Sequence, residues 1–255
     1  MPLFKMKKVW DYCTYNKPFF LLILLIFCIW VYIFESYEDL NLFWAVLIIL
    51  FLEILFLGYG MTITRDRINE GIRLPKIMIK DILILGFKSI IVYVVYLSVQ
   101  GYILYLICSP LGFPNFDLED LLMEYPNTIH LLFSHNPVDA LVFVVLGAII
   151  FYISVFFMEI ALARLADTGS IISAFNLLGV KRNIDTIGWR NYAKDYTFIV
   201  LAIVLFSSLT HIVFPVDILN YAWDVLLFLF MFVTQYWGIG TIYCKIKRKE
   251  KIDYS

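Results

Sequence analysis

Six long apolar runs, separated by charged segments, are the feature that most constrains how this chain folds. An α-helix rises about 1.5 Å per residue, so about 20 apolar residues cross the roughly 30 Å hydrocarbon core of a bilayer. Outer-membrane strands would instead show alternating segments of about 10 residues. We therefore expect six membrane-spanning helices. They occupy approximately residues 19–34, 42–63, 82–107, 138–163, 198–214 and 222–243.

The composition supports a membrane protein and excludes several other classes. Hydrophobic residues make up 62% of the chain and charged residues only 16%, whereas soluble domains average about 25% charged residues. These values exclude an ordinary soluble enzyme, a disordered chain and a nucleic-acid-binding protein. The predicted fold class is an all-α polytopic helical bundle with interfacial amphipathic helices, built as a single membrane domain over residues 1–255.

Lysine and arginine are distributed unevenly among the segments that connect the apolar runs. The two chain ends and the loops 64–81 and 164–197 contain all but one of the 20 basic residues, and the remaining one, Lys88, lies inside the third run. Basic loops stay on the cytoplasmic side of a membrane. The pattern predicts a plasma-membrane protein with both termini in the cytoplasm, and a basic inner face suited to anionic lipids.

The connecting segments carry amphipathic patterns of their own. The loop 64–81 is broken at Pro75 and predicts two short interfacial segments. In the loop 164–197, Ser170 is placed to cap a helix that either lies in the membrane interface or packs beneath the bundle. The outer loop 108–137 predicts either a lid or a partner-binding surface. The expected apolar stripe of the capped helix consists of Ile171, Ile172, Phe175, Leu177 and Leu178.

Glu53 is the strongest anomaly because it falls near the middle of the second span. A charge at the bilayer centre costs about 2.5–3.5 kcal/mol on insertion scales, so such a residue faces the bundle and pairs, or stays protonated. Lys88 and Glu159 lie about 10 Å and about 7 Å from the inner ends of their spans, against about 15 Å for Glu53. The Lys88 side chain is long enough to bridge the difference of about 5 Å to Glu53, which suggests a buried cluster of the three residues. The cluster would be a structural ion pair or a proton or ion relay. Lys88 and Glu159 could also extend to the inner headgroups instead.

Two further polar residues and two glycine pairs stand out within the spans. Gln100 and Gln235 are expected to hydrogen-bond across helices, as polar residues in membranes commonly do. Gly58 and Gly60 end the second span as Gly238 and Gly240 end the sixth. This similarity predicts close helix packing or a weak internal repeat.

The sequence gives little support for a metal site or for catalysis. His130, His135 and His211 all fall on the predicted outer side, but their spacing is not that of metal ligands, and an interfacial role is the default. The motifs His-Glu-x-x-His, Gly-x-Ser-x-Gly and Gly-x-x-x-x-Gly-Lys are absent from the sequence. We therefore predict no cofactor, no catalytic residues and no nucleic-acid partner, and an enzyme is not favoured.

A series of short motifs resembles a known family of prokaryotic membrane proteins. The residues are the Gly58-Tyr59-Gly60 run, Arg65 and Arg67, Leu74-Pro75, Gly86, and later Gly169-Ser170 with Ala174-Phe175. This pattern is similar to that of the domain of unknown function 4013, which is common in archaea. The resemblance extends from the second span through the fifth. It implies a multi-pass bundle and transfers no activity or catalytic residues.

The leading functional expectation is a non-enzymatic membrane module that binds a lipid or a partner protein, which includes another copy of the chain. Its basis is the low density of buried charge and the presence of large amphipathic loops. The alternative is a small transporter or channel subunit that uses Glu53, Lys88 and Glu159.

Overall fold

The structure is a computed structural model that describes residues 6–35, 42–108 and 137–253, and within these residues it is all-α. Among the described residues, five helices are long and apolar enough to cross a membrane, and a sixth crossing is added if a bent helix pair counts as one span. The polytopic helical bundle predicted from the sequence is therefore confirmed. The helices are α1 (Met6–Thr14), α2 (Lys17–Glu35), α3 (Leu42–Ile68), α4 (Ile79–Cys108), α7 (Pro137–Thr168), α8 (Ile171–Phe175), α9 (Leu177–Ile187), α10 (Trp189–Leu209) and α11 (Asp217–Asp253).

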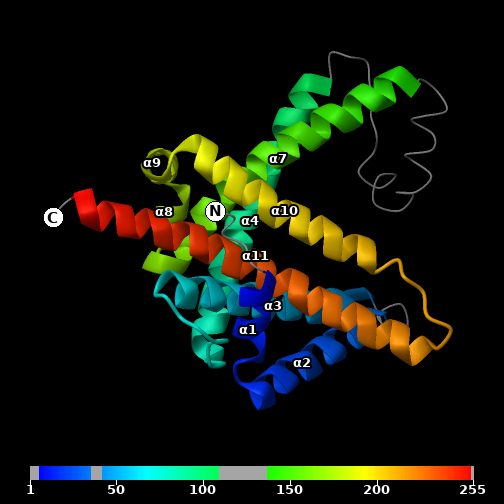
Figure 1. The fold of residues 1–255 in the computed structure, drawn as a ribbon. Coiled ribbons are helices and arrows are strands. Elements are labelled where there is room, and N and C mark those ends of the chain that lie inside the picture. The colour runs from blue at the N-terminus through cyan, green and yellow to red at the C-terminus, as the bar shows by residue number, and fades with distance from the viewer. Residues whose placement is uncertain (1–5, 36–41, 109–136, 254–255) are drawn as a thin grey trace. The chain divides into compact units, whose positions relative to one another are not determined.

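The chain forms two compact units. One unit contains Met1–Val92 and Glu159–Ser255, and the other contains Tyr93–Met158. In the first unit, α11 is the central helix and packs against α3, α10, α2 and α9 (Figure 1). It is also the candidate span with the largest buried share. The middle of α11 suits this central place, because buried apolar residues from Val225 to Tyr243 lie on several faces of the helix, and a helix covered by neighbours on every face needs no polar stripe there.

The first span begins at a sharp bend. The short helix α1 is amphipathic and turns by 96° into α2. Asn16 accepts a hydrogen bond from the Phe19 backbone at 3.4 Å, and Pro18 stands in the first turn of α2, where its missing N–H is not needed. Val9, Tyr12 and Cys13 of α1 are buried. The bend therefore lets α1 pack sideways on the bundle while α2 runs along the predicted first span.

The fifth predicted span, 198–214, is misplaced along the chain. The helix α10 begins at Trp189 and ends at Leu209, so residues 210–214 lie beyond it. The hydropathy of the sequence misses its first turns because they contain Lys194 and Asp195. Asp195 accepts an ion-paired hydrogen bond from Lys245 of α11 at 2.5 Å, and this pairing lets polar residues continue the helix past the apolar run.

The loop 64–81 also differs from the prediction of two short interfacial segments. The helix α3 continues through Ile68, and Glu70 and Gly71 then turn the chain, Glu70 with a φ of 65°. Residues 71–78 form no helix before α4 begins at Ile79. The helix α3 can continue past the apolar run because the Arg65 and Arg67 side chains hydrogen-bond to other helices, as described below, and so do not need water as their partner.

The loop 164–197 contains two helices in place of one capped helix. Ser170 precedes α8, but its side chain makes no capping hydrogen bond, and Asn176 instead caps α9 by accepting from the Gly179 backbone at 2.9 Å. The packed face consists of Ala174, Val180, Asn183, Ile184 and Ile187. Ile172, Leu177 and Leu178 of the predicted stripe are exposed. The helices α8 and α9 therefore pack against the bundle on one face, and their other face carries exposed apolar side chains.

Candidate functional site

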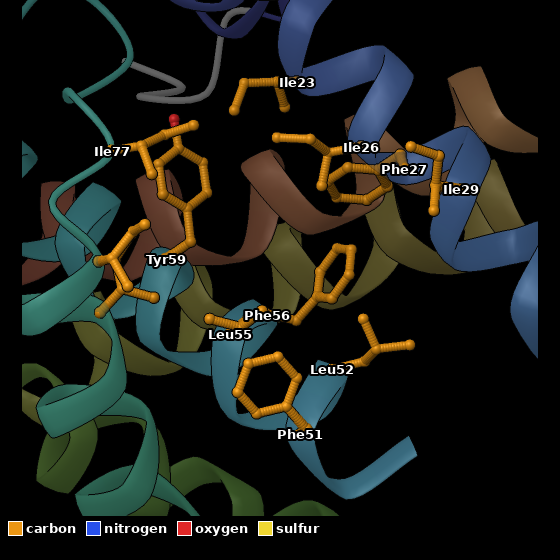
Figure 2. Close-up of a pocket in the computed structure, with 12 residues that line it drawn as sticks. Ile23, Ile26, Phe27, Ile29, Phe51, Leu52, Leu55, Phe56, Tyr59 and Ile77 are labelled. Atoms are coloured by element: carbon orange, nitrogen blue, oxygen red, sulfur yellow. The ribbon is translucent and has the colours of Figure 1, made fainter. Parts of the chain in front are cut away.

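A groove between α2 and α3 is lined almost entirely by apolar side chains. It encloses about 380 Å³. Figure 2 shows side chains of α2 opposite those of α3, with Ile77 of the 71–78 segment near one end. We call this feature the α2–α3 groove. Its lining residues are Ile23, Ile26, Phe27, Ile29, Phe51, Leu52, Leu55, Phe56, Tyr59, Ile77, Ile79 and Ile82.

The polar atom that Tyr59 brings to the groove is already engaged. The Tyr59 hydroxyl donates to the carbonyl oxygen of Pro75 at 3.3 Å, and it points toward Ile77 in Figure 2. This bond ties the 71–78 segment to α3 and closes one end of the groove. Because the hydroxyl has a partner, the groove offers an almost entirely hydrocarbon surface to an occupant.

Three exposed lysines lie close in the sequence to the elements that form the groove. Lys76 and Lys80 flank the lining residues Ile77 and Ile79, and Lys17 begins the helix that forms the opposite wall. None of the three has an ion pair or hydrogen bond with another described residue. Their charges are therefore not neutralised by another described side chain.

A second, smaller cavity contains Glu53. It encloses about 230 Å³ among α2, α3, α10 and α11, and we call it the Glu53 cavity. Glu53 is half-buried and makes no hydrogen bond or ion pair with any other residue that the structure describes. The cavity is lined by Glu53, Gln235, Phe27, Phe56, Leu57, Ile203, Phe228, Met231, Phe232 and Tyr236.

Gln235 connects this cavity to a second acid. Its Nε2 atom donates to Oε1 of Glu159 at 2.8 Å. Glu159 is 3% exposed, so this interhelical bond lies in the interior of the bundle. The structure therefore places Glu53 and Gln235 around one cavity and links Gln235 to Glu159.

Lys88 does not pair with either glutamate. Its Nζ donates to the carbonyl oxygen of Gly169 at 2.6 Å, and Arg65 Nε donates to that of Ala166 at 2.6 Å. Both carbonyls belong to the end of α7, where backbone oxygens lack helical partners and the helix dipole is negative. The three-residue cluster inferred from depth alone is thus replaced by a cap on α7 and a separate Gln235–Glu159 bond.

The remaining predicted polar residue, Gln100, lies in the other compact unit. Its Oε1 atom is buried and has no hydrogen-bond partner among the described residues. The structure therefore gives an interhelical bond to Gln235 and shows none for Gln100 Oε1 in the part of the chain that it describes.

The predicted packing glycines lie where helices approach closely. A Cβ on Gly58 would overlap the Ile82 carbonyl of α4, one on Gly60 the Tyr236 ring, and one on Gly240 the backbone of Thr64. Gly238 is buried. The same close approach occurs at Gly86, whose Cβ would overlap the Ile54 carbonyl. Sequence reasoning used Gly86 only as part of a motif and did not assign it this packing role.

Sequence reasoning also missed the bonds of the inner arginines. Arg164 donates to the Ser173 carbonyl at 2.9 Å and to Asn183 Oδ1 at 3.0 Å. Arg67 donates to Thr241 at 3.0 Å and lies over the Trp237 ring at 5.0 Å. These side chains join elements that are far apart in the sequence. The only signal of these contacts in the sequence is the positions of the arginines and of the nearby glycines.

The histidines contribute no assembled site in the described structure. His130 and His135 lie outside the described residues, and His211 is exposed beyond the end of α10. Among the described residues, no three His, Cys, Asp or Glu side chains gather as metal ligands would.

Residues 41–221 match the model of a family described as Protein of unknown function (DUF4013). The chain belongs to this family. No curated protein and no solved structure matches it.

The DUF4013 match includes only some of the residues that line the Glu53 cavity. The match includes Glu53, Lys88 and Glu159, whereas Phe27 and Gln235 lie outside it. The matched region ends in the first turns of α11. The DUF4013 region thus supplies the acids, and flanking helices of this chain complete the cavity.

Proposed function

We propose that this DUF4013 protein is a non-enzymatic membrane module that binds an anionic phospholipid, with one acyl chain in the α2–α3 groove. The observation that carries the proposal is the hydrocarbon lining of the groove, whose Tyr59 hydroxyl is bonded to Pro75. An occupant of such a surface must itself be apolar, because an unpaired polar group there would lose its hydrogen bonds to water.

The length of the groove fits one leaflet of a bilayer. Phe51 and Tyr59 mark its extent along α3, and eight residues of helix span about 12 Å. Half of a hydrocarbon core is about 15 Å. An acyl chain from a single leaflet therefore matches the groove, with its glycerol end toward Ile77 and Ile79.

The free lysines favour an anionic headgroup. Lys76 and Lys80 are exposed and flank the lining residues Ile77 and Ile79 in the sequence, and Lys17 is exposed at the start of α2. A basic residue close to an anionic membrane surface contributes about 1 kcal/mol. Three of them favour a phosphatidylglycerol-like headgroup over a zwitterionic one of the same chain length.

Competitive native mass spectrometry of the purified full-length chain tests this proposal. The protein is offered equal amounts of phosphatidylglycerol and phosphatidylcholine with identical acyl chains. We expect a retained lipid with a several-fold preference for phosphatidylglycerol. The Leu52→Trp variant, which fills the groove, should lose retention of both lipids. The double variant Lys76→Gln/Lys80→Gln should keep lipid but lose the preference.

Lys181→Gln is the matched control, because Lys181 is an exposed lysine paired with Asp185 on α9 and does not line the groove. It should retain lipid as the unaltered protein does. Equal lipid retention by Leu52→Trp and the unaltered protein would overturn the proposal.

We also propose that the basic end of the bundle, defined by Arg65, Arg164 and Lys245, faces the cytoplasm across a plasma membrane. The support is the retention of basic segments on the cytoplasmic side. A fluorescent protein that folds only in the cytoplasm, fused to the C-terminus, should fluoresce in cells. An active periplasmic reporter at the same position would contradict this orientation.

The alternative of a transporter or channel subunit that uses Glu53, Lys88 and Glu159 together has less support. Lys88 is engaged by the end of α7, and its ammonium makes no ion pair with either glutamate.

A further inference from the structure

We infer that the Glu53 cavity is a binding site for a small organic ammonium ion. This site is separate from the lipid proposal and does not depend on it. Phe27 and Phe56 belong to the walls of both the α2–α3 groove and the cavity, but Glu53 and Gln235 belong to the cavity alone.

The first argument is the unpaired acid. Glu53 lies in the middle of α3, within a candidate span, and has no partner among the described residues. Intramembrane acids face a bundle interior or cavity and pair there, because an isolated charge at that depth costs about 2.5–3.5 kcal/mol. The described lining of the cavity includes no basic side chain that could serve as its counter-ion. A bound cation would supply that counter-ion.

The second argument is the aromatic wall. Five of the ten lining residues are aromatic, and they come from α2, α3 and α11. The rings of Phe27, Phe56 and Phe232 pack edge-to-face, with centroid separations of 4.7 to 5.7 Å. Aromatic faces attract desolvated cations, and quaternary ammonium groups are bound in aromatic cages of this kind. The wall therefore favours an organic ammonium over a hydrated metal ion.

The third argument is that Gln235 offers a hydrogen-bond acceptor to the cavity. One N–H of Gln235 Nε2 donates to Glu159, and the side-chain carbonyl oxygen of Gln235 has no partner among the described residues, so this oxygen can accept from a ligand. Glu53 and Gln235 then both offer acceptors. A ligand with N–H donors or a diffuse positive charge fits them, whereas an anion does not.

The volume limits the size of the ligand. About 230 Å³ is smaller than the range of roughly 300–1,000 Å³ typical of pockets for drug-sized molecules. A compact cation such as benzyltrimethylammonium is of the right class. Long amphiphiles belong instead to the larger α2–α3 groove.

The test is equilibrium binding of benzyltrimethylammonium to the full-length chain in detergent, measured by calorimetry. Its neutral isostere, neopentylbenzene, is measured in parallel. We expect the cation to bind at least tenfold more tightly than the isostere. Glu53→Gln should abolish that preference, because it keeps the side-chain shape and removes the charge.

Glu159→Gln is the matched control. Glu159 is also an acid within a span, but it is not among the residues that line the cavity, and a glutamine there can still accept from Gln235. This variant should bind the cation within a few-fold of the unaltered protein. Equal binding of cation and isostere, or full cation binding by Glu53→Gln, would overturn the inference.

A measurement on the unaltered protein covers the case in which Glu53→Gln does not fold. A hydrophobic carbodiimide modifies carboxyl groups within membranes, and peptide mass spectrometry locates the adduct. Benzyltrimethylammonium should protect Glu53 in a concentration-dependent way, and neopentylbenzene should not. Modification of Glu53 at the same rate with and without the cation would also overturn the inference.

Discussion

Gly58 of α3 and Gly86 of α4 each lie against a backbone carbonyl of the opposite helix, Gly58 at Ile82 and Gly86 at Ile54. The two glycines therefore form a reciprocal crossing in which neither helix has room for a Cβ. Small residues at such crossings let helix backbones approach closely in membranes, where van der Waals packing replaces the hydrophobic effect as the driving force. The crossing fixes α4 beside the wall of the α2–α3 groove to which Ile82 belongs.

Gly58→Ala and Gly86→Ala should each destabilise the protein by about 1–3 kcal/mol, the usual cost of overpacking. The obstacle in both cases is backbone, which does not rotate away as a side chain can. Unfolding in sodium dodecyl sulfate, followed by circular dichroism, measures the change.

Gly101→Ala is the control for this prediction. A Cβ there meets nothing within 4 Å, so the higher helix propensity of alanine should leave stability unchanged or raise it by up to about 1 kcal/mol. A Gly58→Ala protein as stable as Gly101→Ala would refute the close crossing.

Gln235→Leu should destabilise the bundle because it removes the amide that donates a hydrogen bond to the buried Glu159 carboxyl. Interhelical hydrogen bonds in membranes average about 0.6 kcal/mol and reach about 1.7 kcal/mol. A double-mutant cycle with Glu159→Leu isolates the pair term, since each single change leaves one polar group unpaired. Additive effects of the two changes would show that the bond contributes nothing to stability.

Arg164→Gln should release α8 and α9 from the bundle. The guanidinium donates to Ser173 and Asn183, and hydrogen bonds to charged donors contribute about 1.5–3 kcal/mol. Hydrogen exchange at the Val180 and Ile184 amides should accelerate while the amides of α11 stay protected.

The exposed Arg190 provides the matched control for Arg164, because its side chain has no hydrogen bond or ion pair with another described residue. Arg190→Gln should leave the exchange of α9 unchanged. Unaltered protection of α9 in Arg164→Gln would mean that the apolar contacts of Val180, Ile184 and Ile187 hold the helix without the arginine.

The Cys13 thiol should resist alkylation in the folded protein. Cys13 is 1% exposed in α1, and a buried thiol is both inaccessible and hard to ionise. Treatment with a water-soluble maleimide, followed by peptide mass spectrometry, should show modification of Cys13 only after denaturation. Rapid modification in the folded state would show that α1 does not stay packed on the bundle.

The sequence predicted the spans well where an apolar run and a helix cover the same residues. Residues 42–63, 82–107, 138–163 and 222–243 all fall within helices of the structure. The fifth predicted span, 198–214, is shifted relative to α10, which begins at Trp189, because the first turns of α10 contain a charge that pairs across the bundle. Hydropathy registers the cost of a charge but not the partner that offsets it.

The candidate sites were only partly predictable. Glu53 stood out by its depth, and Gln235 by its polarity within a span. Depth along the membrane is one coordinate, and it placed Lys88 beside the glutamates. The direction in which each helix faces is a second coordinate, and it sends Lys88 to the end of α7 instead.

By itself, the sequence determined that this chain is a polytopic helical bundle, because about 20 consecutive apolar residues have few stable states other than a spanning helix. It also determined that the basic residues gather in four segments. The tertiary structure alone decided that Gln235 bonds to Glu159, that Gly58 and Gly86 cross, and that Glu53 faces an aromatic cavity. The physical reason is that these relationships depend on how each helix is rotated and how closely the helices pack. Both arise between segments, so the residue pattern of a single segment does not determine them.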